Sequence, residues 1–347
     1  MIRKTLGRTL GGIALAAAFT LPALAQTKEV NIYSQRQNYL IQPLLDAFTK
    51  ETGIKVNVIF AQTGLVERMV AEDKNSPADL MLTADIGFLI NAVQAGVTQP
   101  IKSEVVEKNI PANYRDPAGH WVGLTSRARV VYASKERVKQ DTITYEELAD
   151  PKWKGKICVR SGQHAYNLAL IASMISHQGE AKTKEWLQGV KANLAAKPAG
   201  GDREQAKAIF SGQCDIALGN TYYMALMASN EKQPEQKQWA QAVKVLFPNA
   251  GDRGTHTNIS GVVLAKHAPN KDNAVKLIEF LTSDEAQKLY AQLNDEYPLK
   301  NGIALSPVVA SWGTLKADPL PLAEIAKHRK RASELVDEVA FDQGPAS

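Results

Sequence analysis

The chain has 347 residues, of which 41 are Lys or Arg and 36 are Asp or Glu, so its formal net charge at pH 7 is +5. Because positive and negative charges nearly balance, the net charge argues against a nucleic-acid-binding protein. A chain of this length is long for a single hydrophobic core and suits two lobes.

The first 25 residues have the pattern of a cleaved secretory signal. Basic residues at positions 3, 4 and 8 precede a short apolar stretch, which ends in Ala23-Leu24-Ala25. This pattern predicts export, with cleavage between Ala25 and Gln26, and it lowers the formal charge from +5 to +2 because three basic residues are removed. The segment is too short to span a bilayer stably and offers no cysteine for a lipid anchor at the junction, so we expect a free, exported protein.

Strands and helices alternate in the first part of the chain. We predict a strand over Val30–Tyr33, a helix over Leu40–Phe48 and a strand over Ile54–Phe60. This order forms a βαβ unit, whose ligands gather where the first strand meets its helix, so residues 34–39 are expected at the edge of a cleft. A helix, a strand and a further helix follow over 64–73, 79–83 and 86–93, which completes a first α/β lobe.

Two β-rich stretches are expected to join this lobe to a second one. Leu124–Tyr132 leads toward a second set of elements, and residues 253–261 with the strand after them lead back. We therefore expect the N-terminal lobe to comprise residues 26–126 and about 253–300, and the C-terminal lobe residues 127–252 and about 301–347. A last helical stretch over Leu320–Val339 packs at the end, and no low-complexity linker separates the lobes.

Three tyrosines stand at strand-to-helix junctions of the second lobe. Tyr166 follows the strand Ile157–Arg160 and a short loop, whereas Tyr222 and Tyr223 follow the apolar run Ile216–Leu218. With Asn220 or Thr221 as the N-cap, the paired rings fall in the first helical turn, where unpaired N–H groups and the helix dipole favour an anion such as phenolate. Taken alone, adjacent tyrosines are more often interface or core residues whose hydroxyl groups reach solvent.

The sequence contains no P-loop, HExxH, GxSxG or CxxC motif, and its six histidines are scattered, so catalysis has no support. Three converging phenols would suit a hard, highly charged cation, and tyrosinate is a known iron ligand. Because a free phenol has a pKa of about 10, a strong Lewis acid such as Fe(III) is the natural candidate. In an exported protein the pair Cys158 and Cys214 is more often a disulfide than a metal site.

The order of motifs along the mature chain resembles the periplasmic ferric-ion-binding proteins of ABC importers. The motifs are V-N-I-Y-S-x-R-Q, N-S-P-A-D-L, N-I-P-A-N-Y-R-D, L-T-S-R-A-R-V-V-Y, D-P-K-W-K-G-K-I-C-V-R-S-G, G-N-T-Y-Y, R-G-T-H-T-N-I-S-G-V and Y-P-L. The resemblance implies a type II periplasmic-binding-protein fold whose two α/β lobes close on Fe(III) about hinge strands, with Tyr166, Tyr222 and Tyr223 as ligands. It also implies a periplasmic, non-enzymatic monomer that serves an inner-membrane ABC permease.

The chain departs from many of these relatives after the first strand. Where they have a His-Tyr pair that supplies further ligands, an ungapped comparison places Gln37 and Asn38, with Tyr39 one position later. The chain therefore resembles the three-tyrosine branch, in which an anion such as carbonate completes the coordination and the residues at Gln37 and Arg127 hold it. Arg36 and Tyr39 are the next candidates, and the alternative for Arg127 is a salt bridge within the crossover strand.

Two other functions fit the same residues. The chain could be a binding protein for a small organic solute on which the tyrosines stack, or a secreted hydrolase. A purple-red colour from charge transfer between phenolate and iron would favour the ferric site. Saturable binding of an uncoloured solute would favour the second function, and turnover the third.

Overall fold

The computed structural model describes Met1 and residues 28–345. The predicted signal segment beyond Met1 and its cleavage site therefore lie outside the described residues. Within the described part, none of the helices combines the length and the apolar character that crossing a membrane requires.

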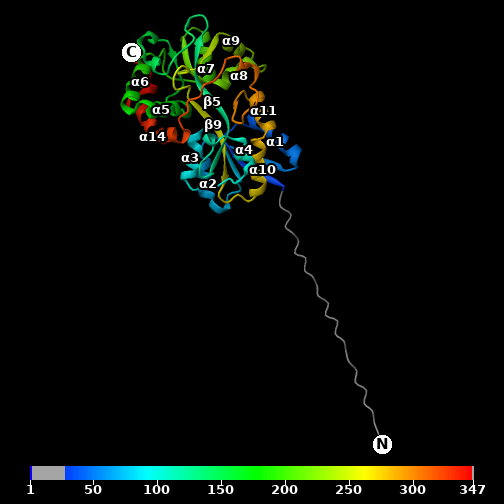
Figure 1. Ribbon diagram of the computed structural model, residues 1–347. Coiled ribbons are helices and arrows are strands. Elements are labelled where there is room, and N and C mark those ends of the chain that lie inside the picture. The colour runs from blue at the N-terminus through cyan, green and yellow to red at the C-terminus, as the bar shows by residue number, and fades with distance from the viewer. Residues whose placement is uncertain (2–27, 346–347) are drawn as a thin grey trace.

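One mixed sheet runs through two lobes, and helices cover it (Figure 1). The main strand order is β2-β1-β3-β9-β5-β7-β6, with β4 paired to β9 and with β8 and β10 paired to β5. The strands are β1 (Glu29–Ser34), β2 (Lys55–Phe60), β3 (Leu80–Thr83), β4 (Thr98–Gln99), β5 (Trp121–Ser134), β6 (Ile157–Cys158), β7 (Ile216–Asn220), β8 (Val243–Leu246), β9 (Thr257–Ala265) and β10 (Tyr297–Pro298).

Figure 1 places α1 to α4 and α10 in the first lobe, and α5 to α9 and α14 in the second. The α-helices are α1 (Asn38–Thr52), α2 (Leu65–Glu72), α3 (Ile86–Gln94), α4 (Glu104–Asn109), α5 (Ala165–Gln178), α6 (Glu180–Ala192), α7 (Asp202–Phe210), α8 (Thr221–Ala228), α9 (Glu235–Gln241), α10 (Lys271–Leu281), α11 (Asp284–Leu293), α12 (Pro307–Ala310), α13 (Leu322–Lys327) and α14 (Arg329–Glu338). The predicted α/β alternation is thus confirmed, although the expected strand Ile157–Arg160 is shorter, as β6.

The strand β5 carries the sheet from one lobe into the other, and every residue of it is buried. Its first half pairs antiparallel with β9, as far as Ala128 opposite Thr257. Its second half pairs with β7 and β8, beginning with Arg129 opposite Asn220. The predicted crossover between the lobes is thus β5. The predicted return is β9, since this strand also pairs with β3 of the first lobe. The residue boundaries of the lobes stay a prediction.

The first lobe begins with the predicted βαβ unit, in which β1 pairs in parallel with β2. The helix α1 buries Ile41, Leu44, Leu45 and Phe48, the positions at helical spacing. It ends at Gly53, which has a φ of 68° and whose N–H donates to the carbonyl of Thr49, so a residue that tolerates the left-handed conformation closes the helix. The helix begins at Asn38, four residues after the end of β1, so residues 35–37 lie at the carboxyl end of that strand.

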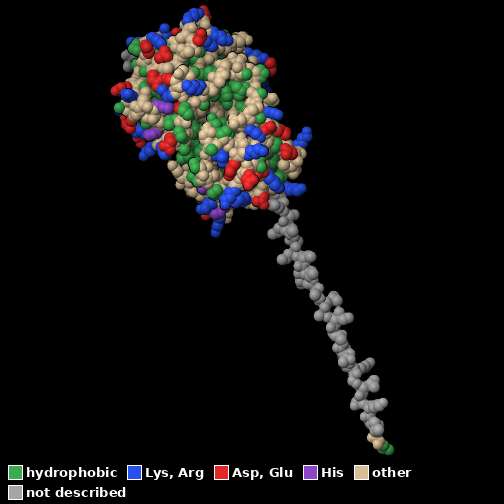
Figure 2. Space-filling view, in the orientation of Figure 1, with side chains coloured by type: hydrophobic (Ala, Val, Ile, Leu, Met, Phe, Trp, Pro, Cys, Tyr) green, Lys and Arg blue, Asp and Glu red, His purple; other side chains and the backbone are tan. Residues whose placement is uncertain are grey.

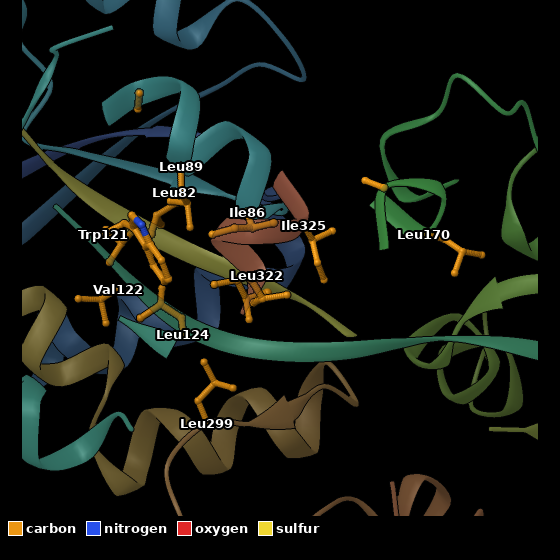
Figure 3. Packing of buried hydrophobic residues seen from close by; sticks show 14 of the residues in the cluster. Leu82, Ile86, Leu89, Trp121, Val122, Leu124, Leu170, Leu299, Leu322 and Ile325 are labelled. Atoms are coloured by element: carbon orange, nitrogen blue, oxygen red, sulfur yellow. The ribbon is translucent and has the colours of Figure 1, made fainter. Parts of the chain in front are cut away.

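The C-terminal segment lies against both lobes. We predicted one helical stretch over Leu320–Val339, but the structure has two helices, α13 and α14, that meet at His328. Figure 3 shows Leu322 and Ile325 of α13 beside Ile86 of α3, within the continuous hydrophobic core. At the break, Arg329 forms an ion pair with the buried Asp85, the N-cap residue of α3. The segment therefore joins the C-terminal helices to the first lobe by apolar contacts and by charge.

The charges on the outer surface are mixed. On the face seen in Figure 2, Lys and Arg side chains are interspersed with Asp and Glu over both lobes. Many form pairs, as where Arg331 contacts Glu180, Glu334 and Glu338. This arrangement fits the nearly balanced net charge of the sequence.

Candidate metal centre

Two strand-to-helix junctions of the second lobe bring three tyrosines together. The hydroxyl of Tyr166, in the first turn of α5, lies 3.1 Å from the hydroxyl of Tyr222, in the first turn of α8. The rings of Tyr222 and Tyr223 lie 4.3 Å apart between centroids, with 36° between their planes. Tyr222 is 9% exposed, and the other two are partly buried. Among residues 28–345, no three side chains of His, Cys, Asp or Glu are grouped to hold a metal ion.

The corner before α8 is shaped by close packing of the backbone. Asn220 is the N-cap residue, and its carbonyl accepts a hydrogen bond from the hydroxyl of the buried Tyr132. A Cβ atom at Gly219 would lie 2.1 Å from Cζ of Tyr132, so only glycine leaves room for that ring. The glycine of G-N-T-Y-Y thus lets Tyr132 support the turn that presents Tyr222 and Tyr223.

A disulfide links the strands that lead into the two junctions. Cys158 of β6 is bonded to Cys214, which lies just before β7, and the Cα atoms are 5.9 Å apart. The same strands pair in parallel, with Cys158 opposite Ala217. The predicted disulfide is confirmed, and it ties the strand before Tyr166 to the segment before Tyr222.

Guanidinium groups surround the tyrosines. The Cζ atoms of Arg127 and Arg160 lie 5.7 and 5.4 Å from the ring centroid of Tyr166, and that of Arg203 lies 5.0 Å from the ring of Tyr223. Nη2 of Arg127 and the Nε atoms of Arg160 and Arg203 are buried and have no hydrogen-bond partner among the described residues. Such a group of cations with unused donors favours negative charge at the site.

Sequence reasoning missed Arg160 and Arg203. Arg160 stands six residues before Tyr166, in the loop after β6, and that proximity could have suggested it. Arg203 lies in α7, and no local pattern points to it, because only the packing of α7 against β7 brings it to Tyr223.

Tyr222 and Tyr223 hold their protons in the metal-free protein. Burial raises the pKa of Tyr222 well above its usual value, and the neighbouring phenols of Tyr166 and Tyr223 raise it further. Burial also raises the pKa of Tyr223 to about 12. A cation that bound these oxygens as phenolates would therefore have to displace protons at neutral pH.

On the first-lobe side, the predicted residues Arg36 and Arg127 are connected through one hydroxyl. Oγ of Ser260 accepts hydrogen bonds from Nη1 of Arg36 at 2.8 Å and from Nη1 of Arg127 at 3.2 Å. Arg36 is also engaged by Glu296 through two bonds of 2.8 Å. Arg127, which is 2% exposed, forms no salt bridge with any described residue, so the ion pair considered for it is not found.

The structure does not bring Gln37 or Tyr39 into the tyrosine cluster. Gln37 is the exposed N-cap residue of α1, and its side chain makes no capping hydrogen bond. Tyr39 is 57% exposed at the start of the same helix. No hydrogen bond or ring contact within the described part joins either side chain to Tyr166, Tyr222 or Tyr223.

A protein family and several known proteins match most of this chain. The family model described as bacterial extracellular solute-binding protein matches residues 33–288. Iron uptake protein A1 of Synechocystis is 44% identical over 318 residues, which cover 91% of this chain and 88% of the relative.

Solved structures are similar over the same extent. The apo ferric ion-binding protein A of Pasteurella haemolytica is 55% identical, with a TM-score of 0.87, and the match covers 91% of this chain and 98% of that chain. A Trichodesmium protein in complex with iron and citrate ligands is 42% identical, with a TM-score of 0.85, and covers 90% and 99%. The family consists of binding proteins for transport and not of enzymes. A family match over most of the chain, together with relatives that share its full two-lobe fold, means that this protein belongs to the bacterial extracellular solute-binding proteins.

Proposed function

We propose that this protein binds ferric iron in the periplasm and delivers it to an ABC-type importer of the inner membrane, with Tyr166, Tyr222 and Tyr223 as the metal ligands. The observation that carries the proposal is the convergence of three phenols from two helix starts, with 3.1 Å between the hydroxyls of Tyr166 and Tyr222. Phenolate oxygens are hard donors that suit a small, highly charged cation.

Similar proteins support ferric iron as the cargo. The relatives compared above are described as an iron uptake protein, a ferric ion-binding protein and a complex with iron. Each match covers about nine-tenths of this chain. The proposal therefore concerns the whole binding protein, including periplasmic export after cleavage near Ala25, action as a monomer, and a permease partner in the inner membrane.

The proposal includes an anion, such as carbonate, as a further ligand of the metal. Three phenolates leave coordination positions of a ferric ion open, and the buried Nη2 of Arg127 has no hydrogen-bond partner among residues 28–345. A guanidinium is well suited to hold a planar oxyanion. Gln37, at the N-terminus of α1, would contact the anion from the first lobe when the lobes close, so that the anion bridges them.

The test is titration of the metal-free protein with ferric iron in the presence of carbonate. We expect one iron per chain and a purple-red band from charge transfer between phenolate and iron. Tyr166→Phe, Tyr222→Phe and Tyr223→Phe should each weaken binding strongly and shift or remove the band, because the ring stays packed while the ligand oxygen is lost.

The matched control is Tyr33→Phe, which removes a buried phenol of the first lobe that donates to Glu72. This variant should keep the band and the affinity of the wild type. If two of the three ligand variants also kept both, the assignment of the ligands would be wrong. An uncoloured wild-type protein that bound an organic solute instead would contradict the ferric function itself.

A further inference from the structure

We propose that Asp202 is a positioning residue that fixes the two tyrosine-bearing junctions relative to each other. The inference rests on the proposed ferric site and adds to it a residue outside the ligand set. Asp202 is the first residue of α7, and its carboxylate is fully buried between the two junctions.

The carboxylate of Asp202 accepts three hydrogen bonds. Oδ2 accepts from Nη1 of Arg129 at 2.7 Å and from the backbone N–H of Asn220 at 2.8 Å. Oδ1 accepts from Nη1 of Arg160 at 3.1 Å. Bonds from charged donors to a buried carboxylate are short and strong, so this group is a rigid point in the lobe.

The first connection leads to the paired tyrosines. Asn220 is the N-cap residue of α8, two positions before Tyr222. Because Asp202 binds the backbone N–H of Asn220, it fixes the main chain at the corner from which Tyr222 and Tyr223 project. The side chain of Asn220 is held as well, since its Oδ1 accepts from Nη1 of Arg129 at 3.2 Å.

The second connection leads to Tyr166. Nη2 of Arg129 donates to Oδ1 of Asn167, the next residue in α5, at 2.7 Å. The amide of Asn167 donates in turn to the carbonyls of Arg160 and Ser161, at 3.1 and 3.0 Å. Arg160, bound to Asp202, covers the Tyr166 ring at 5.4 Å. Asp202 thus acts on Tyr166 in two ways. Through Arg129 and Asn167 it fixes the start of α5, and through Arg160 it places a guanidinium over the ring.

These two connections explain how hydroxyls 56 residues apart in sequence lie 3.1 Å apart. Metal ligands must be held to within about half an ångström of their working positions. Without the carboxylate, the guanidiniums of Arg129 and Arg160 would lose their only negatively charged partner among the described residues and turn toward other acceptors, and both junctions would shift. The network around Asp202 therefore sets the distance between the ligands before any metal arrives.

The decisive variant is Asp202→Asn, which keeps the size of the side chain but cannot accept all three bonds as a carboxylate does. We expect the affinity for ferric iron to fall about 10- to 100-fold, as for residues that orient metal ligands. The charge-transfer band should also shift or weaken. In iron-free protein labelled with ¹³C at the tyrosine Cζ atoms, the signals of Tyr166 and Tyr222 should move, whereas that of Tyr33 in the other lobe should not.

The matched control is Asp79→Asn. Asp79 is also fully buried and accepts from backbone N–H groups, of Asn31 at 2.7 Å and of Asn270 at 2.6 Å, but it lies before β3 in the first lobe. This variant should lower the melting temperature and leave the band and the iron affinity as in the wild type. Wild-type band, affinity and tyrosine signals in Asp202→Asn would overturn the inference.

A second variant decides the matter if Asp202→Asn does not fold. Arg160→Gln removes a cation whose side chain is only 15% exposed and leaves the pair of Asp202 with Arg129 intact. We expect it to shift the band and to move the Tyr166 signal, and a wild-type result in both measurements would again overturn the inference. Failure of the wild-type protein to bind ferric iron is a separate outcome, because it would refute the proposed function on which the inference rests.

Discussion

At the scale of single residues, the site combines phenols that resist ionisation with cations that favour it. Burial keeps Tyr222 and Tyr223 protonated in the metal-free protein, since it raises the pKa of both phenols. The guanidiniums of Arg127 and Arg160 lie over the ring of Tyr166, and that of Arg203 lies over the ring of Tyr223. These cations favour the charged form that a metal would bind. Protons and metal therefore compete for the same oxygens.

This competition predicts how iron binding depends on pH. Each phenol must lose a proton when it binds the metal, so acidification should weaken the apparent affinity, by up to about tenfold per pH unit for each proton released. The measurement is competition for iron against a chelator from about pH 8 to about pH 6, corrected for the protonation of the chelator. An affinity that did not change over this range would argue against tyrosinate ligands.

Two histidines, the buried His256 and the half-buried His164, predict a separate pH dependence, that of folding. Burial, with the nearby Arg129, lowers the pKa of His256 to about 3, and burial with Arg160 lowers that of His164 to about 4. In the unfolded chain a histidine has a pKa of about 6.5, so the unfolded state takes up protons first as the pH falls. Stability should therefore be present above about pH 6.5 and should fall on acidification, by up to about 1.4 kcal/mol per pH unit for the buried His256. The contribution of His164 should be smaller, because solvent screens its partly exposed ring.

Melting temperatures of the iron-free protein at a series of pH values test this prediction. His256→Gln should make the loss of stability on acidification less steep, whatever its effect at neutral pH. An unchanged slope in His256→Gln would contradict the role of the buried imidazole.

At the scale of elements, the strand-to-helix junctions were predictable because their signals are local. An apolar run, a capping residue and the two tyrosines stand next to one another in sequence, and the structure has β7, Asn220 as N-cap and α8 in that order. The crossover β5 was likewise visible as a long β-rich stretch. Asp202 and Arg203 were not predictable, because they reach the site through hydrogen bonds and ring contacts between elements.

The same distinction applies to Arg36 and to the C-terminal helices. Arg36 was expected near the site from its position after β1, but its partner Glu296 is 260 residues away, and no local pattern reveals such a pair. The periodicity of residues 320–339 predicted a helix correctly, whereas the break at His328 accompanies the ion pair of Arg329 with Asp85 of the first lobe. Tertiary contacts decided both outcomes.

The corner before α8 supplies a prediction at this scale. In Gly219→Ala, the new methyl group would overlap the ring of Tyr132, so the strand or the ring must move, at a cost of about 1 to 3 kcal/mol. We expect a lower melting temperature and weaker iron binding, because Tyr222 and Tyr223 follow directly.

Gly251→Ala is the control for this variant, since a Cβ atom there meets nothing within 4 Å. It should leave the melting temperature and the iron affinity close to those of the wild type. Equal behaviour of the two alanine variants would show that the fit between Gly219 and Tyr132 does not support the site.

At the scale of the whole molecule, the two lobes share one sheet through β5 and β9, and the proposed anion would connect them a second time. Arg127 lies on β5 and reaches toward Ser260 of β9 on one side and Tyr166 on the other. An anion held there would add contacts that exist only when Gln37 approaches, so it would favour the closed form.

Small-angle scattering with and without ferric iron and carbonate tests the link between anion and closure. The wild-type protein should become more compact when both are added. Arg127→Ala should keep the tyrosine band but lose the effect of carbonate on affinity, and should remain more open. Arg68→Gln, at an exposed position of α2, is the control and should close as the wild type does. A wild-type response of Arg127→Ala to carbonate would place the anion elsewhere.

All three proposed ligands project from one lobe, whose two junctions are joined by the disulfide between Cys158 and Cys214. Capture and retention of the metal then become separate kinetic events. Capture would involve only the lobe that carries the tyrosines, so its rate constant would depend on encounter and proton release and not on the hinge. Release would require the other lobe to withdraw first, so the residence time of the ion would be governed by the hinge. A permease that spread the lobes apart could in this way shorten the residence time without touching a single ligand.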